Sequence, residues 1–135
     1  MHQSTQLKER TKEFAIRIVR MFQSLPRTEE ARILGRQVLR SGTSVAANYC
    51  AVCRSRSRAE FVAKIGTVVE EMDETVFWLE LLTETSIVNP KQMDNLRAEA
   101  NELLAIFAAS QRTVKSAPFE AKRTHRSALN DSMTQ

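Results

Sequence analysis

The chain has 135 residues, of which 42% are hydrophobic and 6% aromatic, with only three Gly and three Pro. This length suffices for one domain with its own core, and so few turn residues argue against a β-sandwich or barrel and favour an all-α fold. The net charge is +4. No apolar leader follows Met1, and the longest apolar run, residues 103–109, is too short to span a bilayer. We expect a cytoplasmic protein with no membrane partner.

The first predicted helix covers residues 7–24, where apolar side chains recur every three or four positions. Pro26 ends this helix. Thr28 is suited to cap a second helix, because its hydroxyl accepts a free first-turn N–H group while two glutamates follow at the positive end of the helix dipole. The apolar positions of the first helix are Leu7, Phe14, Ile18, Phe22 and Leu25.

The second predicted helix includes most of the stretch RSGTSVAANYCAVCRSRSR, residues 40–58, and the chain turns near residues 54–57. Its apolar stripe passes through Gly42 without a change of helical phase. Gly42 on this stripe predicts close approach of a neighbouring helix. A phosphate-binding loop is excluded, because Gly35 and Gly42 lack the Walker spacing and no strand precedes them. The stripe consists of Ala31, Leu34, Val38, Gly42, Val45, Tyr49 and Val52.

A capping box, Ser57-Arg58-Ala59-Glu60, opens the third predicted helix, so the serine and the glutamate are expected to bind each other's backbone N–H groups. Asn89-Pro90 opens the fourth, with Pro90 at the first helical position, and this helix ends before Pro118. Residues 1–117 are therefore predicted to form a four-helix bundle, and residues 118–135 a disordered tail. The two apolar seams are Phe61, Ile65, Val68, Met72, Val76, Leu79 and Leu82, and Met93, Leu96, Ala100, Leu103, Phe107 and Val114.

The Cys50-Ala-Val-Cys53 motif supplies only half of a zinc site, and the two histidines, His2 and His125, lie near the chain ends. A thioredoxin-like redox motif would begin a helix next to a strand, whereas this one lies inside a helix. We expect free thiols that pack, buried or half-buried, as small hydrophobes. No metal site and no cofactor are predicted.

Catalytic residues are not predicted either. The acidic run at residues 70–74 lacks the Glu-x-x-His pattern of a di-iron bundle, and Met72 occupies the core position within it. No Ser/His/Asp or Cys/His combination has a suitably placed histidine. We therefore expect a protein that is not an enzyme.

Charge is segregated along the chain. Residues 1–64 carry 13 Lys/Arg and 5 Asp/Glu, a net charge of +8, whereas residues 65–110 carry 2 and 9, a net charge of −7. Residues 111–135 carry 5 Lys/Arg and 2 Asp/Glu, a net charge of +3. The protein thus has a basic half and an acidic stretch.

Six arginines, and no Lys, Asp or Glu, lie between residues 31 and 59. Four of them fall within about 80° on a helical wheel, opposite the apolar stripe, along roughly 35 Å of helix. Such a stripe can bind the phosphates of RNA or DNA. Guanidinium groups also pair with carboxylates, so an alternative role in subunit or partner contacts stays open. The predicted nucleic-acid-binding residues are Arg32, Arg36, Arg40, Arg54 and Arg58.

Large apolar side chains also lie outside the predicted core. On the third helix, Phe77 and Leu81 fall opposite the seam, with Trp78 on its flank. An isolated bundle would expose them to water. A cluster of this kind is typical of an interface, so these three residues are predicted to form an oligomer contact.

Several pieces of the sequence together resemble the four-helix bundle proteins encoded in intervening sequences of 23S ribosomal RNA genes. They are Leu-Gly-Arg-Gln followed by Arg-Ser-Gly-Thr-Ser-Val, then Arg-Ser-Arg-Ala-Glu-Phe, then Asp-Glu-Thr-x-x-Trp-Leu-Glu-Leu-Leu. The similarity covers residues 14–114.

The resemblance implies an up-and-down bundle that assembles as a ring-shaped homopentamer. Related proteins are accessory factors, including the accessory variability determinant, of the reverse transcriptase in diversity-generating retroelements, and they look like basic nucleic-acid-binding scaffolds. The implied partners are therefore copies of the same chain, RNA or DNA, and a reverse transcriptase. No enzymatic activity is implied.

Overall fold

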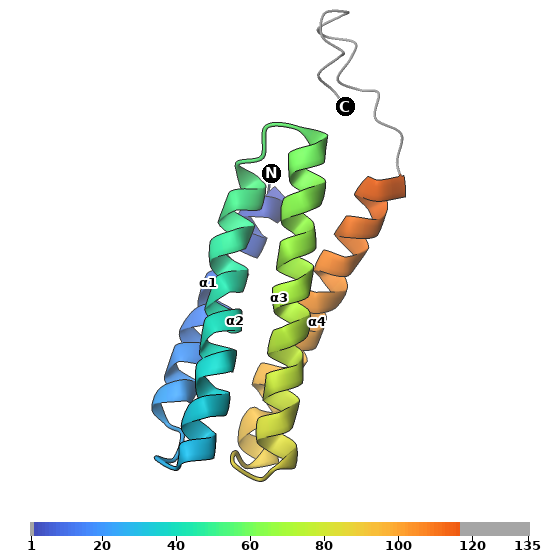
Figure 1. Ribbon diagram of the computed structural model, residues 1–135. Helices are drawn as coiled ribbons and strands as arrows, with labels where there is room; N and C mark the ends of the chain where they lie inside the picture. Colours follow the sequence, from blue (N-terminus) through green and yellow to red (C-terminus); the bar gives the residue numbers. More distant parts are fainter. Residues whose placement is uncertain (1, 117–135) are drawn as a thin grey trace, which may run out of the picture.

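Four helices make up the structure, a computed structural model that describes residues 2–116 (Figure 1). The helices are α1 (His2–Gln23), α2 (Glu29–Cys53), α3 (Arg58–Glu84) and α4 (Pro90–Ser116). Each runs antiparallel to the one before it, and no strand occurs within residues 2–116. The predicted all-α four-helix fold is confirmed. The predicted tail, residues 118–135, lies outside the described residues.

α1 begins at His2, five residues earlier than the apolar pattern predicts. Residues 2–6 carry no large apolar side chain, so periodicity cannot detect this first turn. The helix is nevertheless held there, because Leu7 is buried and the buried Thr11 hydroxyl donates to the Leu7 carbonyl over 2.9 Å. The predicted start at Leu7 was therefore too late.

α2 begins and continues as the sequence predicts. The Thr28 side chain accepts the Ala31 N–H over 3.3 Å, and the helix passes unbroken through Gly42. A Cβ atom on Gly42 would lie only 2.9 Å from Ile18 Cγ1, and one on Gly35 would lie 2.6 Å from Leu25 Cδ1. Both glycines therefore allow α1 to pack closely against α2, as predicted for Gly42.

The N-terminus of α3 differs in one detail from the expected capping box. Ser57 Oγ accepts the Glu60 N–H over 3.0 Å, as predicted. The Glu60 carboxylate, however, accepts the N–H of Arg56 over 2.9 Å instead of the N–H of Ser57. The extended backbone of Ser57 (φ −148°, ψ 163°) is that of an N-cap residue, so the start of α3 is where the motif predicts.

A tight corner joins α3 to α4. Ser86 has a left-handed backbone (φ 64°), and the N–H groups of Ile87 and Val88 both donate to the Leu82 carbonyl over 3.1 Å. Asn89 Oδ1 then accepts the Lys91 N–H over 2.8 Å, so α4 begins at Pro90 as predicted.

The core follows the predicted stripes. Most of their members are buried, whereas six are half-buried, namely Phe22, Leu25, Leu34, Phe61, Val76 and Val114. Between α2 and α3 the core contains one polar contact, a hydrogen bond of 2.9 Å between the hydroxyl groups of Thr75 and Ser41. None of the four helices described combines the length and apolarity needed to cross a membrane.

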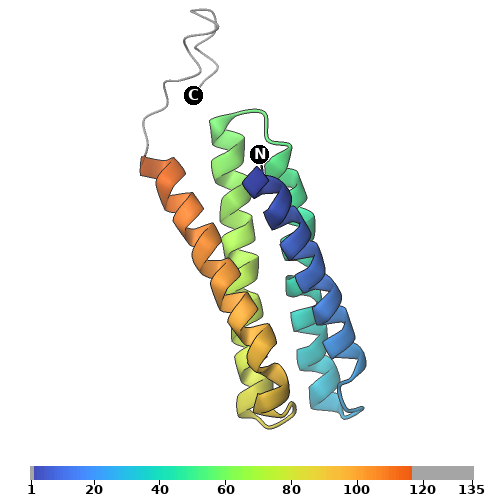
Figure 2. The same cartoon turned by 180° about the vertical axis from the view of Figure 1, so that it is seen from behind.

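α1 and α4 close the other side of the bundle (Figure 2). They share much less contact than the other neighbouring pairs, and an ion pair supplements it. The Arg10 guanidinium donates to both carboxylate oxygens of Glu99, over 3.1 and 2.8 Å. This bidentate contact raises the pKa of Arg10 above its usual value.

Candidate nucleic-acid interface

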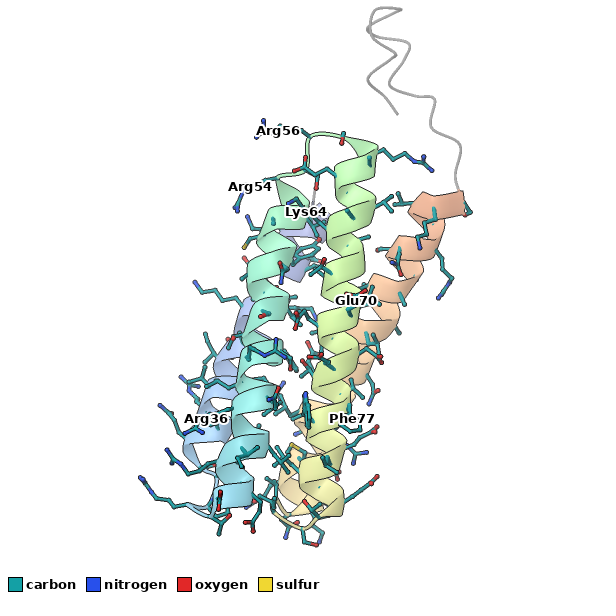
Figure 3. All side chains as sticks on the ribbon, in the orientation of Figure 1. Arg36, Arg54, Arg56, Lys64, Glu70 and Phe77 are labelled. Atoms are coloured by element: carbon teal, nitrogen blue, oxygen red, sulfur yellow. The ribbon has the colours of Figure 1, made fainter. Side chains whose placement is uncertain are left out.

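Three of the five predicted arginines, Arg32, Arg36 and Arg54, are exposed on α2. Arg54 is the C-cap residue of that helix. Figure 3 shows Arg36 and Arg54 pointing away from the bundle at the two ends of α2. None of the three forms an ion pair with another residue of the described chain. Their charges are thus available to an external anion.

Arg40 is engaged within the chain. Its guanidinium lies 3.0 Å from Glu74 Oε1 and 3.7 Å from Glu71 Oε1, both on α3. The side chain remains 54% exposed, but two carboxylates already offset its charge. Arg40 therefore marks the border between the basic side of α2 and the acidic side of α3.

Arg58 faces a different part of the molecule from the α2 arginines. It stands at the start of α3, is half-buried, and donates from Nη2 to the Val114 carbonyl over 2.7 Å. A cation is favoured at that place, because Val114 is in the last turn of α4, the negative end of the helix dipole. The structure therefore leaves three predicted arginines without an ion pair on one face of α2, pairs Arg40 beside them with carboxylates of α3, and places Arg58 on α3.

α1 contributes cations that the helical wheel of α2 could not reveal. Lys8, Lys12 and Arg20 are exposed and have no acidic partner among residues 2–116. Figure 3 shows nitrogen-tipped side chains along both α1 and α2 on this side of the bundle. The net charge of +8 over residues 1–64 was the sequence signal for this broader basic surface.

The outward side of α3 is acidic. Glu70 and Asp73 are exposed, and Figure 3 shows Glu70 projecting from α3. A polyanion would be repelled from this helix. Phosphate contacts are therefore expected along α1 and α2 and not along α3.

Phe77, Trp78 and Leu81 lie on α3, and Figure 3 shows Phe77 on the side of α3 that faces away from α2. Phe77 is 53% exposed, as expected, whereas Trp78 and Leu81 are half-buried, and Trp78 packs against the core. The rings of Phe77 and Trp78 meet edge to face, with centroids 4.9 Å apart. The expectation that an isolated bundle exposes all three is thus met by Phe77 and only in part by Trp78 and Leu81.

Sequence analysis missed a second exposed apolar residue, Ile33 of α2, which is 49% exposed. Ile33 and Arg40 are seven residues apart and so share one side of α2, and Arg40 reaches Glu74 of α3. Because Ser41 lies opposite Thr75 in this antiparallel pair, Ile33 lies level with the turn of α3 that contains Leu81. Phe77, Trp78 and Leu81 are hereafter called the apolar patch.

The expectation of buried or half-buried free thiols is met by Cys50 and wrong for Cys53. Cys50 is half-buried but Cys53 is exposed, so they do not pack together as core hydrophobes. Cys53 lines a pocket of about 400 Å³ together with Tyr49, Ser55 and Phe61. Burial, and secondarily the neighbouring Cys53, raises the pKa of Tyr49 to about 12. Among the side chains that the structure describes, those of residues 4–116, no group of three or more His, Cys, Asp and Glu is placed to hold a metal ion.

Comparison with known proteins decides the family. The family model of the 23S rRNA-intervening sequence protein matches residues 3–109. The chain belongs to this family. No match is found among curated proteins. The solved structure of an S23 ribosomal protein family member of unknown function, from Bacteroides thetaiotaomicron VPI-5482, has 31% sequence identity and a TM-score of 0.75. That match covers 82% of this chain and 98% of the other.

The family match agrees with the sequence resemblance over nearly the whole bundle. It includes all of α2 and α3 and most of α1 and α4. The matched range, residues 3–109, therefore lies within the helical bundle and contains the arginines of α2 and the apolar patch.

Proposed function

We propose that this protein is a non-enzymatic, homo-oligomeric scaffold that binds the phosphates of RNA or DNA. The observation that carries the proposal is the exposed set Arg32, Arg36 and Arg54, which have no ion pair within the described chain. Arginine forks bind phosphate oxygens bidentately. Because the contacts are to phosphates, binding is expected to discriminate little between sequences.

The spacing of these arginines favours an extended polyanion as the ligand, and argues against a small phosphorylated molecule. Arg32 and Arg36 are one turn apart, and Arg54 follows about 27 Å farther along α2 at 1.5 Å per residue. The whole set spans about 33 Å, close to one helical turn of B-DNA. A single phosphate could not contact both ends of α2.

The first prediction concerns the salt dependence of binding. The Arg32→Gln/Arg36→Gln/Arg54→Gln variant is expected to bind a labelled duplex more weakly than the wild type. If each arginine neutralises one phosphate, the slope of log K against log salt is expected to be smaller in magnitude by about 2–3. Fluorescence anisotropy at several salt concentrations measures both quantities.

The matched control removes three exposed cations from α4, in the Lys91→Gln/Arg112→Gln/Lys115→Gln variant. It loses the same charge from another helix, so it measures the effect of net charge alone. Equal weakening in both variants would locate binding elsewhere, and an unchanged slope in the α2 variant would remove the basis of the proposal. Circular dichroism checks that both variants keep their helices.

A second candidate function is a protein-interaction module, and the apolar patch favours it. Its most exposed member, Phe77, lies on α3, which is acidic outside and packs against basic α2. Arg40 already pairs with glutamates between these two helices, so the same chemistry is suited to join subunits. The partner would be further copies in a homopentamer, as the family resemblance implies, or a protein such as a reverse transcriptase.

A further inference from the structure

A pocket of about 400 Å³ lies at the corner between α1 and α2, at the lower left of the bundle in Figure 1. Phe22 and Leu25 line it from the end of α1 and the loop, and Ala31 lines it from the first turn of α2. Phe22 and Leu25 are only half-buried. A ligand in this pocket would therefore meet an aromatic ring and aliphatic groups.

The corner that forms the pocket is well supported. A Cβ atom on Gly35 would lie 2.6 Å from Leu25 Cδ1 and 3.1 Å from Phe22 Cδ1, so both side chains pack directly on α2 at this glycine. The N–H groups of Ser24 and Leu25 donate to the carbonyls of Met21 and Phe22, over 3.0 and 3.1 Å. The apolar side of the pocket is therefore formed in the absence of any ligand.

Polar and cationic side chains complete the pocket. Gln23, Arg27 and Arg32 also line it, and all three are exposed. Neither arginine forms an ion pair with another residue of the described chain. The two glutamates in the first turn of α2, Glu29 and Glu30, do not line the pocket. Its charge is therefore positive, and an anionic ligand is favoured.

The combination of groups selects the ligand. An unpaired nucleobase stacks on aromatic rings through its faces, forms hydrogen bonds at its edges, and carries a phosphate on either side. The pocket offers a ring, an amide and two guanidinium groups. Arg32 also belongs to the exposed set with Arg36 and Arg54, so the pocket is continuous with the proposed phosphate-binding face. In a duplex the bases are stacked inside and could not enter.

We infer that the pocket binds the base of an unpaired nucleotide, while Arg27 and Arg32 contact the phosphates on either side of it. The inference rests on the proposed function, and it names the preferred ligand, a nucleic acid with a single-stranded end or loop. A peptide carboxylate is a weaker match, because it brings one charge and no aromatic face.

The test compares two labelled duplexes by fluorescence anisotropy at one salt concentration. One carries unpaired nucleotides at both ends, and the other has the same unpaired backbone without bases, so the phosphates are equal in number. The wild type is expected to bind the first at least about fivefold more tightly, the lower limit for one base stacked on an aromatic ring. Phe22→Leu is expected to bring this ratio close to one while affinity for the abasic duplex is unchanged. Phe61→Leu, the same change at a half-buried phenylalanine outside this pocket, is the control and is expected to keep the ratio.

A second readout locates the base without any protein variant. With 4-thiouracil in the unpaired segment, ultraviolet light is expected to crosslink the nucleic acid to the segment of residues 22–32, as identified by mass spectrometry. Crosslinks confined to other parts of the chain would place the base elsewhere and overturn the inference.

The titrations separate this inference from the proposed function. If the wild type binds both duplexes equally, the base pocket is refuted and phosphate binding stands. If it binds neither duplex even at low salt, both are refuted. A ratio that falls equally in Phe22→Leu and Phe61→Leu would also refute the pocket, and circular dichroism checks that both variants keep their helices.

Discussion

Tyr49, the single tyrosine of the chain, shows how burial changes the chemistry of one residue. Its side chain is 6% exposed, and its ring lies 5.2 Å from that of Phe107. Burial disfavours the charged phenolate, and the neighbouring Cys53 adds to this effect, so the pKa is raised to about 12. The hydroxyl therefore stays protonated far into alkaline conditions.

The tyrosinate absorbance of the native protein is expected to rise with a midpoint near pH 12. In denaturant the same titration is expected near the ordinary value of about 10. Between these values the unfolded state loses its proton before the native state does, so the stability that is present below pH 10 declines as pH rises towards 12. Tyr49→Phe is expected to remove this part of the decline. A native midpoint near 10 would contradict the buried position of Tyr49.

The contacts of each single arginine also determine whether its charge is available to an external ligand. Arg36 and Arg40 look equivalent in the sequence, one turn apart on the same helix. Only Arg40 faces carboxylates of α3, because a rotation of about 40° along the wheel turns it toward the neighbouring helix. The sequence can therefore locate the stripe but cannot tell which of its members is already paired.

At the scale of elements, the closest helix contact depends on glycine. α1 crosses α2 where Gly42 and Gly35 lack side chains, and the β-branched Ile18 fills the space over Gly42. Ile18 cannot readily move away, because its side chain is stiff and completely buried. The absence of a side chain at Gly42 thus allows α1 and α2 to approach this closely.

Gly42→Ala is expected to be less stable than Gly66→Ala by about 1–3 kcal/mol. Both changes gain the same helix propensity of about 1 kcal/mol. Only the first places a methyl group 2.9 Å from Ile18 Cγ1, whereas the second meets the flexible end of Gln111 at 3.3 Å. Urea unfolding followed by circular dichroism measures the difference. Equal stability of the two variants would show that α1 shifts away from α2 without cost.

At the scale of the whole molecule, charge and apolar surface are arranged on separate sides. α1 and α2 are basic, α3 is acidic outside, and the apolar patch lies on α3. This arrangement allows the basic side of one copy to face the acidic side of another while the patches are covered. A ring assembled in this way would keep part of the basic surface available to nucleic acid.

Light scattering after size exclusion is expected to give about five times the 15.3 kDa mass of one chain. Phe77→Ser is expected to reduce this mass at low protein concentration, because it removes the most exposed large apolar group of the patch. Val19→Ser, a change at an exposed apolar residue of α1, is the matched control and is expected to leave the mass unchanged. A wild type that is monomeric at every concentration would exclude self-association through the patch.

The apolar periodicity and the capping residues were enough to predict the helices and most of the core. Thr28, Ser57 and Asn89 act as caps in the structure, because capping depends on residues within one turn. The pattern failed at the first turn of α1, where residues 2–6 are polar. For Trp78 and Leu81, which are half-buried, it gave the direction of the side chain but not the degree of burial, since a helical wheel does not show how far a neighbouring helix covers a residue.

The sequence by itself thus determined the number, order and inward faces of the helices, and the basic and acidic character of their segments. These properties are local, because they follow from side chains within a few turns of one another. Only the tertiary structure decided that Arg40 is paired while Arg36 is not, that Ile33 and Phe77 are both exposed, and that Cys53 faces solvent. Each of these depends on the rotation and register of one helix against another, which packing over the entire core determines.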